Sequence, residues 1–507
     1  MKKAFTDIFS APWYPVAISA YPVLALLLAN AGQIHLEAGM RALLVSIAFS
    51  GILYFVLWCF LRQVYKAAFL TTLWLALFFT FGHAYIALEG KYTETNYTLW
   101  LATAWIVLFL LALAWVLRSP SAFVSSTATL NTIAFALLAM SFGQISLTGD
   151  PRNVHALGAG HAPVQKDLTL PKNRPDVYYI ILDSYAREDF LKTVYDYDNS
   201  EFVAALQERG FYVAPCSQSN YVRTEISLAS SLNMMYLPEL DDSFTPESIA
   251  RRKLWDSLKH SAVRHNFESL GYETVNFATG FAWMELDDAN LFLSPPPFTS
   301  GMTEFEGLLL DTTFARYIKD WGWVDPDAVM GQVFRDRFNY VFDTMDDIAK
   351  MPGPQFSYIH LLSPHPPFVF DENGNHTYPA DFWNEKGLYP YGLYQEGYTN
   401  QLTYLNKKML KAIDTILEES DVPPIIIIQG DHGPWMQPKN RHIWILNAYY
   451  LPGNTDKLYP TISPVNTFRL VFNSYFGGRY EMLEDASYFS PVPNLYDFSK
   501  IPNSCEQ

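Results

Sequence analysis

The sequence contains little cysteine: Cys59, Cys216 and Cys505 are the three cysteines among 507 residues. So few cysteines exclude a disulfide-rich scaffold and a cysteine-based zinc module, because both need several closely spaced pairs. Cys59 lies in a long apolar run, whereas Cys216 and Cys505 lie in more polar sequence. A Cys216–Cys505 disulfide would require an extracytoplasmic location, and the sequence alone does not establish the pair.

Charged residues are scarce in one part of the chain. Residues 1–150 hold seven basic and five acidic side chains, whereas the rest holds 28 of the 35 basic and 46 of the 51 acidic residues. The first part is therefore predicted to be a membrane domain and the second an acidic globular domain. Phosphate neutralisation needs clusters of lysine and arginine, so we expect no nucleic-acid partner.

The first 150 residues contain long apolar runs with turn-forming or charged residues between them. A membrane-spanning helix needs about 20 mostly apolar residues, and five segments meet this requirement. The first is not expected to be a cleavable signal peptide, because further spans follow it. The predicted spans cover roughly residues 15–31, 42–61, 67–88, 99–117 and 128–147.

Basic residues in short loops indicate the orientation of these spans. Lys2, Lys3, Arg62, Lys66 and Arg118 all fall on one side, which is predicted to be cytoplasmic. Everything after residue 150 is then extracytoplasmic, and the protein is an integral membrane protein. The spans carry no charged pair at mid-depth, which gives ion or proton transport little support. The helices are either a multi-helix anchor or a holder for a lipid substrate.

The remaining sequence has the pattern of an α/β domain. Residues 151–175 are rich in glycine, proline, asparagine and charge, and are predicted to be a juxtamembrane linker. Residues 176–507 alternate apolar strand-like runs with helical patterns, which predicts a largely parallel sheet. The stretch 281–345 is rich in aromatic residues and stays without an assigned element. Strands are expected near residues 177–182, 211–214, 273–277, 356–362, 425–428 and 443–451.

One of these strands ends in residues that suit catalysis. Ile425 to Ile428 are four β-branched apolar residues in a row, typical of a strand buried on both faces. Asp431 and His432 follow, between Gly430 and Gly433. Ligands of open α/β sheets bind just beyond the carboxyl ends of the strands. The alternative is a tight turn in which Asp431 caps the next helix.

Two more polar groups are expected at the same sheet edge. Asp183 follows the strand 177–182, and Thr224 stands at or near the start of a helix. Together with Asp431 and His432 they form a ligand set that suits Zn²⁺ or Mn²⁺. A metal-bound hydroxyl loses its proton more easily, so Thr224 would be the nucleophile. The alternatives are that Thr224 caps its helix and that Asp183 only turns its strand end.

The order of these pieces resembles the membrane-bound branch of the alkaline phosphatase/sulfatase superfamily. That branch includes the lipoteichoic acid synthases and the lipid A phosphoethanolamine transferases. The resemblance rests on Leu182-Asp183-Ser184, on Thr224 after a short polar run, and on Gly430-Asp431-His432-Gly433. It implies an N-terminal five-helix transmembrane domain and an extracytoplasmic α/β sulfatase-like domain. It also implies the bacterial inner membrane, with the catalytic domain on the periplasmic side.

The resemblance further implies roles for individual residues. His365, in Pro364-His365-Pro366, is similar to the family's substrate-binding or leaving-group histidine; the alternative is a histidine held in a proline-rich loop. Phosphate contacts are implied for three residues, although Arg223 has the alternative of a solvated surface charge. The implied cofactor is Zn²⁺ or Mn²⁺, with Mg²⁺ as a further candidate. The implied metal ligands are Asp183, Thr224, Asp431 and His432, and the implied phosphate contacts are Arg223, Arg441 and His442.

The chain also departs from the family pattern. The transferases have glutamate where this chain has Asp183, although sulfatases and phosphatases have aspartate there. The Cys-x-Pro/Ala-x-Arg motif of sulfatases is absent, because Cys216 is followed by Ser217-Gln218-Ser219. The paired cysteines of the phosphoethanolamine enzymes are missing as well. A relative with a different substrate is therefore expected.

Three functional hypotheses follow. The first is a metal-dependent transferase that moves a phospho-head-group, of phosphoethanolamine or phosphoglycerol type, from a membrane phospholipid to an envelope glycan or lipid through a phospho-Thr224 intermediate. The second keeps this site with water as acceptor, which gives a phosphodiesterase, phosphatase or sulfatase-like hydrolase. The third is a non-catalytic envelope scaffold, since a fold alone does not establish activity.

Overall fold

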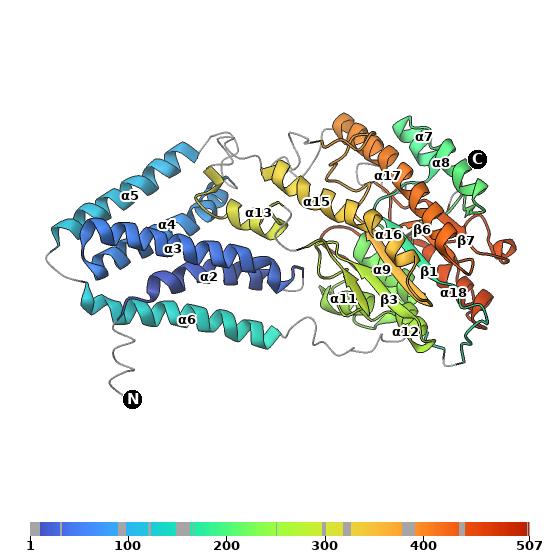
Figure 1. Cartoon of the computed structure of the whole chain (residues 1–507), viewed down its shortest axis with the longest axis horizontal. Coiled ribbons are helices and arrows are strands. Elements are labelled where there is room, and N and C mark those ends of the chain that lie inside the picture. The colour runs from blue at the N-terminus through green and yellow to red at the C-terminus, as the bar shows by residue number, and fades with distance from the viewer. Residues whose placement is uncertain are drawn as a thin grey trace. The chain divides into compact units, whose positions relative to one another are not determined.

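The computed structural model of the chain describes most of its length (Figure 1). The described residues are 11–30, 33–89, 98–119, 123–148, 163–165, 167–249, 251–296, 301–317, 326–377, 391–434, 442–503 and 505.

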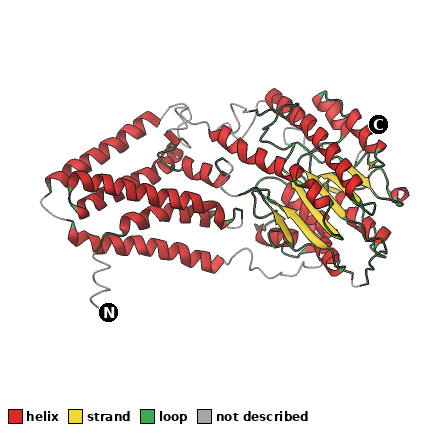
Figure 2. Ribbon diagram, viewed as in Figure 1, coloured by secondary structure: helices red, strands yellow, loops and turns green. Residues whose placement is uncertain are grey.

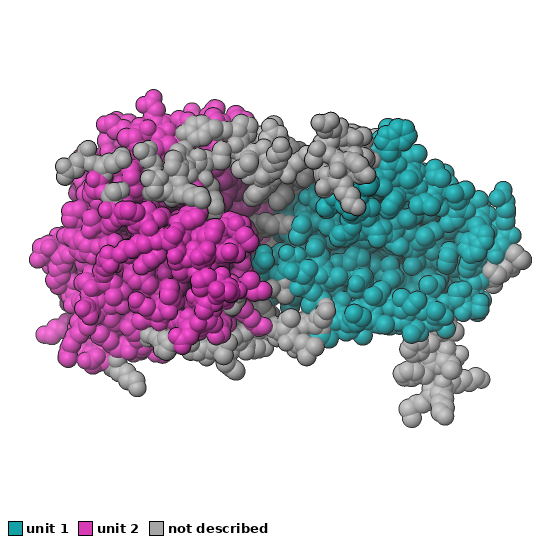
Figure 3. Space-filling view, turned by 180° about the vertical axis from the view of Figure 1, so that it is seen from behind, with its two compact units in different colours: residues 1–153, 300–330 teal, residues 154–299, 331–507 magenta. Residues whose placement is uncertain are grey.

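Two compact units make up the chain. Unit 1 comprises residues 1–153 and 300–330, and unit 2 comprises residues 154–299 and 331–507. Unit 1 is helical in its described part, whereas the strands of the main sheet lie in unit 2 (Figure 2). Figure 3 distinguishes the two units by colour.

All five apolar segments predicted in the first 150 residues are helical. Four are long and apolar enough to cross a membrane. The first, α2, has 16 residues, which falls short of the roughly 20 residues of a typical span. The prediction of five full-length spans is corrected in this detail. The helices are α2 (Tyr14–Ala29), α3 (Met40–Leu61), α4 (Val64–Glu89), α5 (Thr98–Arg118) and α6 (Val124–Thr148), with the short helix η1 (Leu36–Gly39) before α3.

Unit 1 also takes in a stretch from much later in the sequence. Helix α13 (Glu304–Asp311) and the residues that follow it to 317 pack against the membrane helices. Phe305 of α13 is buried in a cluster with Val23, Leu24 and Leu27 of α2. This stretch falls within residues 281–345, to which the sequence pattern assigned no element.

Unit 2 is built on a seven-stranded sheet with the order β2-β7-β6-β1-β5-β3-β4. The five strands from β6 to β4 run parallel. At one edge, β7 pairs antiparallel with β6, and β2 pairs antiparallel with β7. The predicted α/β class with a largely parallel sheet is thus confirmed. The strands are β1 (Val177–Leu182), β2 (Tyr212–Val213), β3 (Glu273–Phe277), β4 (Leu291–Leu293), β5 (Gln355–Leu361), β6 (Ile425–Gly430) and β7 (Asn447–Tyr450).

The central strands are buried on both faces, which explains their continuous apolar sequence. Every residue of β1, β5 and β6 is buried. Alternate residues of β1 enter separate cores: Tyr178 and Ile180 face one set of helices, and Tyr179 and Ile181 face the other. The first set comprises α7 (Glu188–Tyr195), α8 (Ser200–Glu208), α15 (Pro326–Asp343), α16 (Met345–Ala349) and α17 (Tyr391–Glu419); the second comprises α9 (Thr224–Asn233), α11 (Arg251–Lys259), α12 (Ala262–Ser269) and α18 (Pro464–Tyr475).

A disulfide closes the C-terminal part of unit 2. Cys216 and Cys505 are bonded, with their Cα atoms 5.2 Å apart. Between α18 and Cys505 the chain forms a two-stranded antiparallel ribbon of β8 (Ser487–Phe489) and β9 (Ser499–Ile501). The pair that the sequence allowed is therefore formed, which agrees with an oxidising compartment.

Candidate metal and nucleophile site

The candidate site lies where three neighbouring parallel strands end. β1 lies between β5 and β6 in the sheet, and Leu182 of β1 is in register with both Leu361 and Gly430. Asp183 and Asp431 each come directly after their strand, so the register brings them to the same edge. His360 is in register with Ile181, two residues before Asp183.

Asp183, His360 and Asp431 form a buried group suited to a metal ion. Their ligand atoms all lie within 4.8 Å of one another. His360 Nε2 lies 3.4 Å from Asp183 Oδ2. Within the described residues, Asp431 Oδ2 and both ring nitrogens of His360 make no hydrogen bond. Buried polar atoms left without partners are costly, so these atoms fit a site that a divalent cation completes.

His432 adds a second imidazole to this group. Its Nε2 lies 3.8 Å from Asp183 Oδ1 and 3.5 Å from Asp431 Oδ2. Its Nδ1 lies 2.8 Å from the Gly433 carbonyl oxygen, which accepts only, so Nδ1 carries the proton in the neutral ring. The Nε2 lone pair is thereby directed at the carboxylates, as in histidine ligands of metal sites.

The nearby charges shift the pKa values of both partners. Burial acts to lower the pKa of His432, but the negative charges of Asp431 and Asp183 outweigh it, and the pKa is raised above its usual 6.5. Burial acts to raise the pKa of Asp183, but the positive charge of His365, the close approach of His360 and the positive charge of His432 outweigh it and lower the pKa. The group therefore favours a carboxylate at Asp183, the form that binds a cation.

Thr224 is the first residue of α9, and its side chain joins the cluster. Thr224 Oγ1 lies 3.2 Å from His432 Nε2. The N-cap of α9 is Arg223, which makes no side-chain capping bond. Thr224 is therefore not the cap of its helix, which was the alternative to a chemical role. The backbone N–H groups and the dipole at the start of α9 favour an anion beside this hydroxyl.

The backbone around Ser184 holds Asp431 in place. Ser184 has a φ of 64°, in the left-handed region that few residues other than glycine adopt. This turn directs the Ser184 N–H to Asp431 Oδ1 at 2.9 Å. The Ser227 hydroxyl of α9 donates to the Asp431 carbonyl oxygen at 2.7 Å. β1, β6 and α9 are thus joined through one aspartate.

The other predicted site residues lie at different distances from this centre. His365 is half-buried, and its backbone N–H donates to the Asp183 carbonyl oxygen at 3.1 Å. The centroid of its ring lies 6.5 Å from that of the His432 ring. Arg223 is mostly buried, and its Nη2 donates to the Ser490 carbonyl oxygen at 3.5 Å. His442 is buried and accepts the Gly433 N–H through its carbonyl oxygen. Arg441 lies outside the described residues.

The sequence pattern does not single out His360 as a site residue. It stands inside an apolar strand, where a single histidine is easily read as part of the core. A signal was present, since His360 is an ionisable side chain next to the end of a predicted strand, as Asp183 and Asp431 are. The order of strands in the sheet was needed to place it, because only pairing of β5 with β1 brings His360 to Asp183.

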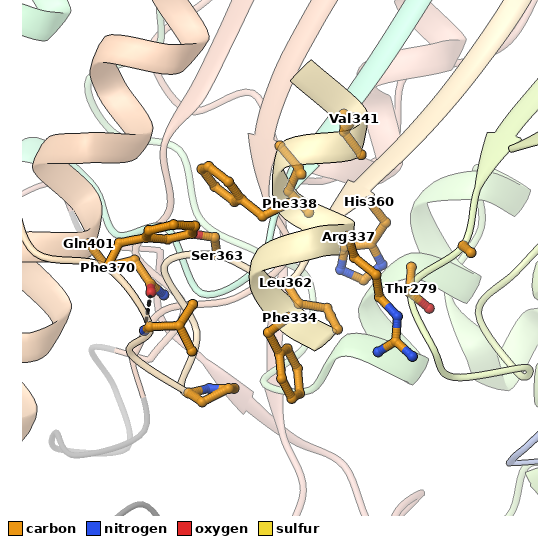
Figure 4. Close-up of a pocket in the computed structure, with 14 residues that line it drawn as sticks. Thr279, Phe334, Arg337, Phe338, Val341, His360, Leu362, Ser363, Phe370 and Gln401 are labelled. Carbon is orange, nitrogen blue, oxygen red and sulfur yellow. Dashed lines mark hydrogen bonds between the residues drawn. The ribbon is translucent and has the colours of Figure 1, made fainter. Parts of the chain in front are cut away.

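A pocket that is partly open to solvent lies beside His360 of the metal group. His360 and Ser363 line it from β5 and the loop after β5, and Phe334, Arg337 and Phe338 line it from α15. Figure 4 shows His360 beside Arg337 and Thr279. Ser363 Oγ is buried and makes no hydrogen bond within the described residues. The pocket is mainly apolar and reaches the candidate metal group through His360.

Comparisons with known proteins give matches among solved structures. No protein-family model matches the chain, and no curated protein matches it. The C-terminal periplasmic domain of EptC from Escherichia coli, in a complex with zinc, is 12% identical with a TM-score of 0.41, and the match covers 65% of this chain and 92% of that one.

Two further solved structures extend the comparison. The integral membrane protein lipooligosaccharide phosphoethanolamine transferase A from Neisseria meningitidis is 11% identical with a TM-score of 0.41, covering 92% of this chain and 95% of that one. The phosphonate monoester hydrolase of Agrobacterium radiobacter is 14% identical with a TM-score of 0.38, covering 63% and 82%. The Neisseria protein is a phosphoethanolamine transferase, one of the two kinds of protein named in the motif resemblance.

Proposed function

We propose that this chain is a metal-dependent transferase that moves a phospho-head-group from a membrane phospholipid to an envelope glycan or lipid. The proposal rests on one observation: the Thr224 hydroxyl stands at a helix N-terminus, 3.2 Å from His432 Nε2, at the edge of a buried group of two aspartates and two histidines. This arrangement suits attack on phosphorus, where positioning and charge neutralisation do most of the work.

Asp183, His360, Asp431 and His432 would hold a divalent ion of the Zn²⁺ or Mn²⁺ type. When bound, such an ion lowers the pKa of a neighbouring hydroxyl and stabilises negative charge on phosphoryl oxygens. The carboxylates and imidazoles are of the types that Zn²⁺ and Mn²⁺ prefer. They come from rigid strand ends, which keeps the geometry fixed between substrates.

The reaction would proceed in two displacements. In the first, Thr224 Oγ1 gives its proton to solvent and forms a bond to the phosphorus of the lipid head group, while the bond from phosphorus to the diacylglycerol oxygen breaks and that oxygen takes a proton from His365. In the second, an acceptor hydroxyl gives its proton to His365 and attacks phosphorus, the bond to Thr224 breaks, and Thr224 regains a proton from solvent. The amides of the first turn of α9 would stabilise the phosphoryl oxygens.

Residues around the metal group would contact the substrate. His365, close to the cluster and half-buried, would donate a proton to the leaving diacylglycerol oxygen. Arg223 precedes the nucleophile and would contact a phosphoryl oxygen, with Arg441 and His442 as weaker candidates for the same task. The phosphoethanolamine or phosphoglycerol type of head group is carried by the motif resemblance alone.

The test is detection of the covalent intermediate. The purified full-length protein is incubated with phospholipids that carry an isotope label in the head group, and the intact mass and a peptide map are recorded. We expect an adduct on Thr224, and Thr224→Ala should lower transfer by at least about a thousandfold. Thr193→Ala, at an exposed threonine of α7, is the matched control.

The outcomes separate the hypotheses. An adduct that a glycan or lipid acceptor discharges into a modified acceptor supports the transferase. Discharge to water alone, whatever acceptor is present, would make the protein a hydrolase. A chain that folds, binds no stoichiometric metal and forms no adduct would be a scaffold, and the proposal would be withdrawn.

A further inference from the structure

A short stretch of the extracytoplasmic sequence is built into the membrane unit. Residues 301–317 lie between β4 and α15 in the chain, yet they pack on the membrane helices within unit 1. Phe305 is 1% exposed, in a cluster with Leu27 of α2 and Ala42 of α3. The Phe314 ring lies 4.8 Å from that of Phe81 and 6.2 Å from that of Trp74, both on α4.

The backbone of this stretch makes two hydrogen bonds to the backbone of α4. The Gly82 N–H donates to the Thr312 carbonyl oxygen at 3.1 Å, and the Phe78 carbonyl oxygen accepts from the Phe314 N–H at 2.8 Å. Residues 312–314 are therefore bonded directly to the helix backbone.

Glycine is required at position 82 for this contact. A Cβ atom on Gly82 would collide with the backbone of Asp311 and Thr312. Backbone atoms do not move aside as a flexible side chain does, so any larger residue must displace the segment. Small residues in membrane helices commonly permit such close approach.

Hydrogen bonds from Arg41 hold the start of the segment. Arg41, at the start of α3, donates from Nε to Glu306 Oε1 at 2.6 Å and from Nη2 to the Gly301 carbonyl oxygen at 2.7 Å. Glu306 also forms the capping box of α13 with Thr303. At the other end, the Arg316 guanidinium lies 4.0 Å over the Tyr85 ring of α4. The segment is thus held at both ends and in the middle.

The geometry points to residues 301–317 as a docking segment whose receptor is the packed surface of α2, α3, α4 and α5. The contacts fall on one end of these helices: the C-terminal parts of α2 and α4, and the N-terminal parts of α3 and α5. That end is opposite Arg62 and Lys66, which the charge rule predicts to be cytoplasmic. The catalytic chain therefore completes the extracytoplasmic end of its own membrane unit.

Cysteine labelling of the full-length protein tests this docking. Phe305→Cys and, separately, Leu308→Cys are made in a Cys59→Ser background, in which Cys216 and Cys505 stay paired. Leu308 is 41% exposed. In nanodiscs, the maleimide labelling rate of the thiol at position 305 should therefore be lower than that of the thiol at position 308 by a factor on the order of ten or more. Gly82→Leu should raise the rate at position 305 by a similar factor, because it displaces the segment.

Matched variants keep the outcome interpretable. Gly51→Leu places the same side chain on a membrane helix where a Cβ meets nothing within 4 Å, and it should leave the rate unchanged. Arg41→Gln should also speed labelling at position 305, whereas Arg118→Gln, at an exposed arginine, should not. The proposal is overturned if position 305 reacts as fast as position 308 in the parent chain, or if Gly82→Leu and Arg41→Gln both match their controls. The readout does not depend on activity at Thr224.

Discussion

The chemistry of single residues in this protein is decided by their neighbours. His360 and His376 are both histidines of unit 2, but only His360 is buried at a strand end, with its Nε2 3.4 Å from a carboxylate. Thr224 is a helix-start threonine whose Oγ1 contacts an imidazole instead of capping the helix. Residue type alone does not separate these cases, because the competing roles use the same atoms.

Replacement of His360 should weaken metal binding. Asp183, His360 and Asp431 form one ligand group, so His360→Ala removes a donor and leaves two buried carboxylates with one imidazole fewer beside them. We expect the affinity for Zn²⁺ or Mn²⁺ to fall by about 10- to 100-fold or more, measured by titration of the chelator-treated full-length protein.

His265→Ala, at an exposed histidine of α12, is the control for loss of any histidine. If the two variants bind the metal with equal affinity, His360 is not a metal ligand. Melting temperatures recorded with and without metal check that both variants fold, and the metal-dependent rise should be smaller in His360→Ala.

At the scale of elements, three strand ends and one helix start build the site. Their convergence follows from the parallel pairing of β5, β1 and β6, which places Asp183 and Asp431 at one edge. α9 packs on the face that Tyr179 shares with Leu228 and Leu232, and this packing directs its first residue toward the same edge. The elements are rigid because their apolar residues are buried on both sides.

The Cys216–Cys505 disulfide should contribute measurably to the stability of unit 2. Its two positions have a sequence separation of 289, so its main effect is to restrict the unfolded chain. The double variant Cys216→Ser, Cys505→Ser should lower the free energy of unfolding by about 2–4 kcal/mol, measured by denaturant titration of the full-length protein. Reduction of the parent protein should give the same loss, and Cys59→Ser should give none.

At the scale of the whole molecule, the chain combines a helical membrane unit with an α/β unit, and the sequence crosses between them more than once. Residues 300–330 return to the membrane unit after the strands β1 to β4 have been completed. A domain boundary drawn near residue 150, with a catalytic domain from 176 to 507, follows composition, which is averaged over long stretches. Such an average does not reveal a short segment that packs with the other unit.

The predicted orientation can be checked by labelling of intact cells. Glu37, Gln63 and Asp421 are exposed, and each is replaced by cysteine in a Cys59→Ser background. A membrane-impermeant maleimide should label Glu37→Cys and Asp421→Cys in intact cells and Gln63→Cys only after lysis, because Arg62 and Lys66 mark the cytoplasmic side. Labelling of positions 37 and 63 from the same side would mean that α3 does not cross.

The sequence by itself determined the membrane half, the α/β class and most strands, because apolar runs and their periods are local properties. It also determined Asp183, Thr224, Asp431 and His432 as candidates, since each follows a strand or opens a helix. Only the tertiary structure decided that His360 joins them, that Thr224 Oγ1 contacts His432, and that residues 301–317 pair with Gly82. These contacts join residues that are distant in sequence. They depend on the order of the strands in the sheet and on the close packing of distant backbone segments, and a local sequence pattern predicts neither.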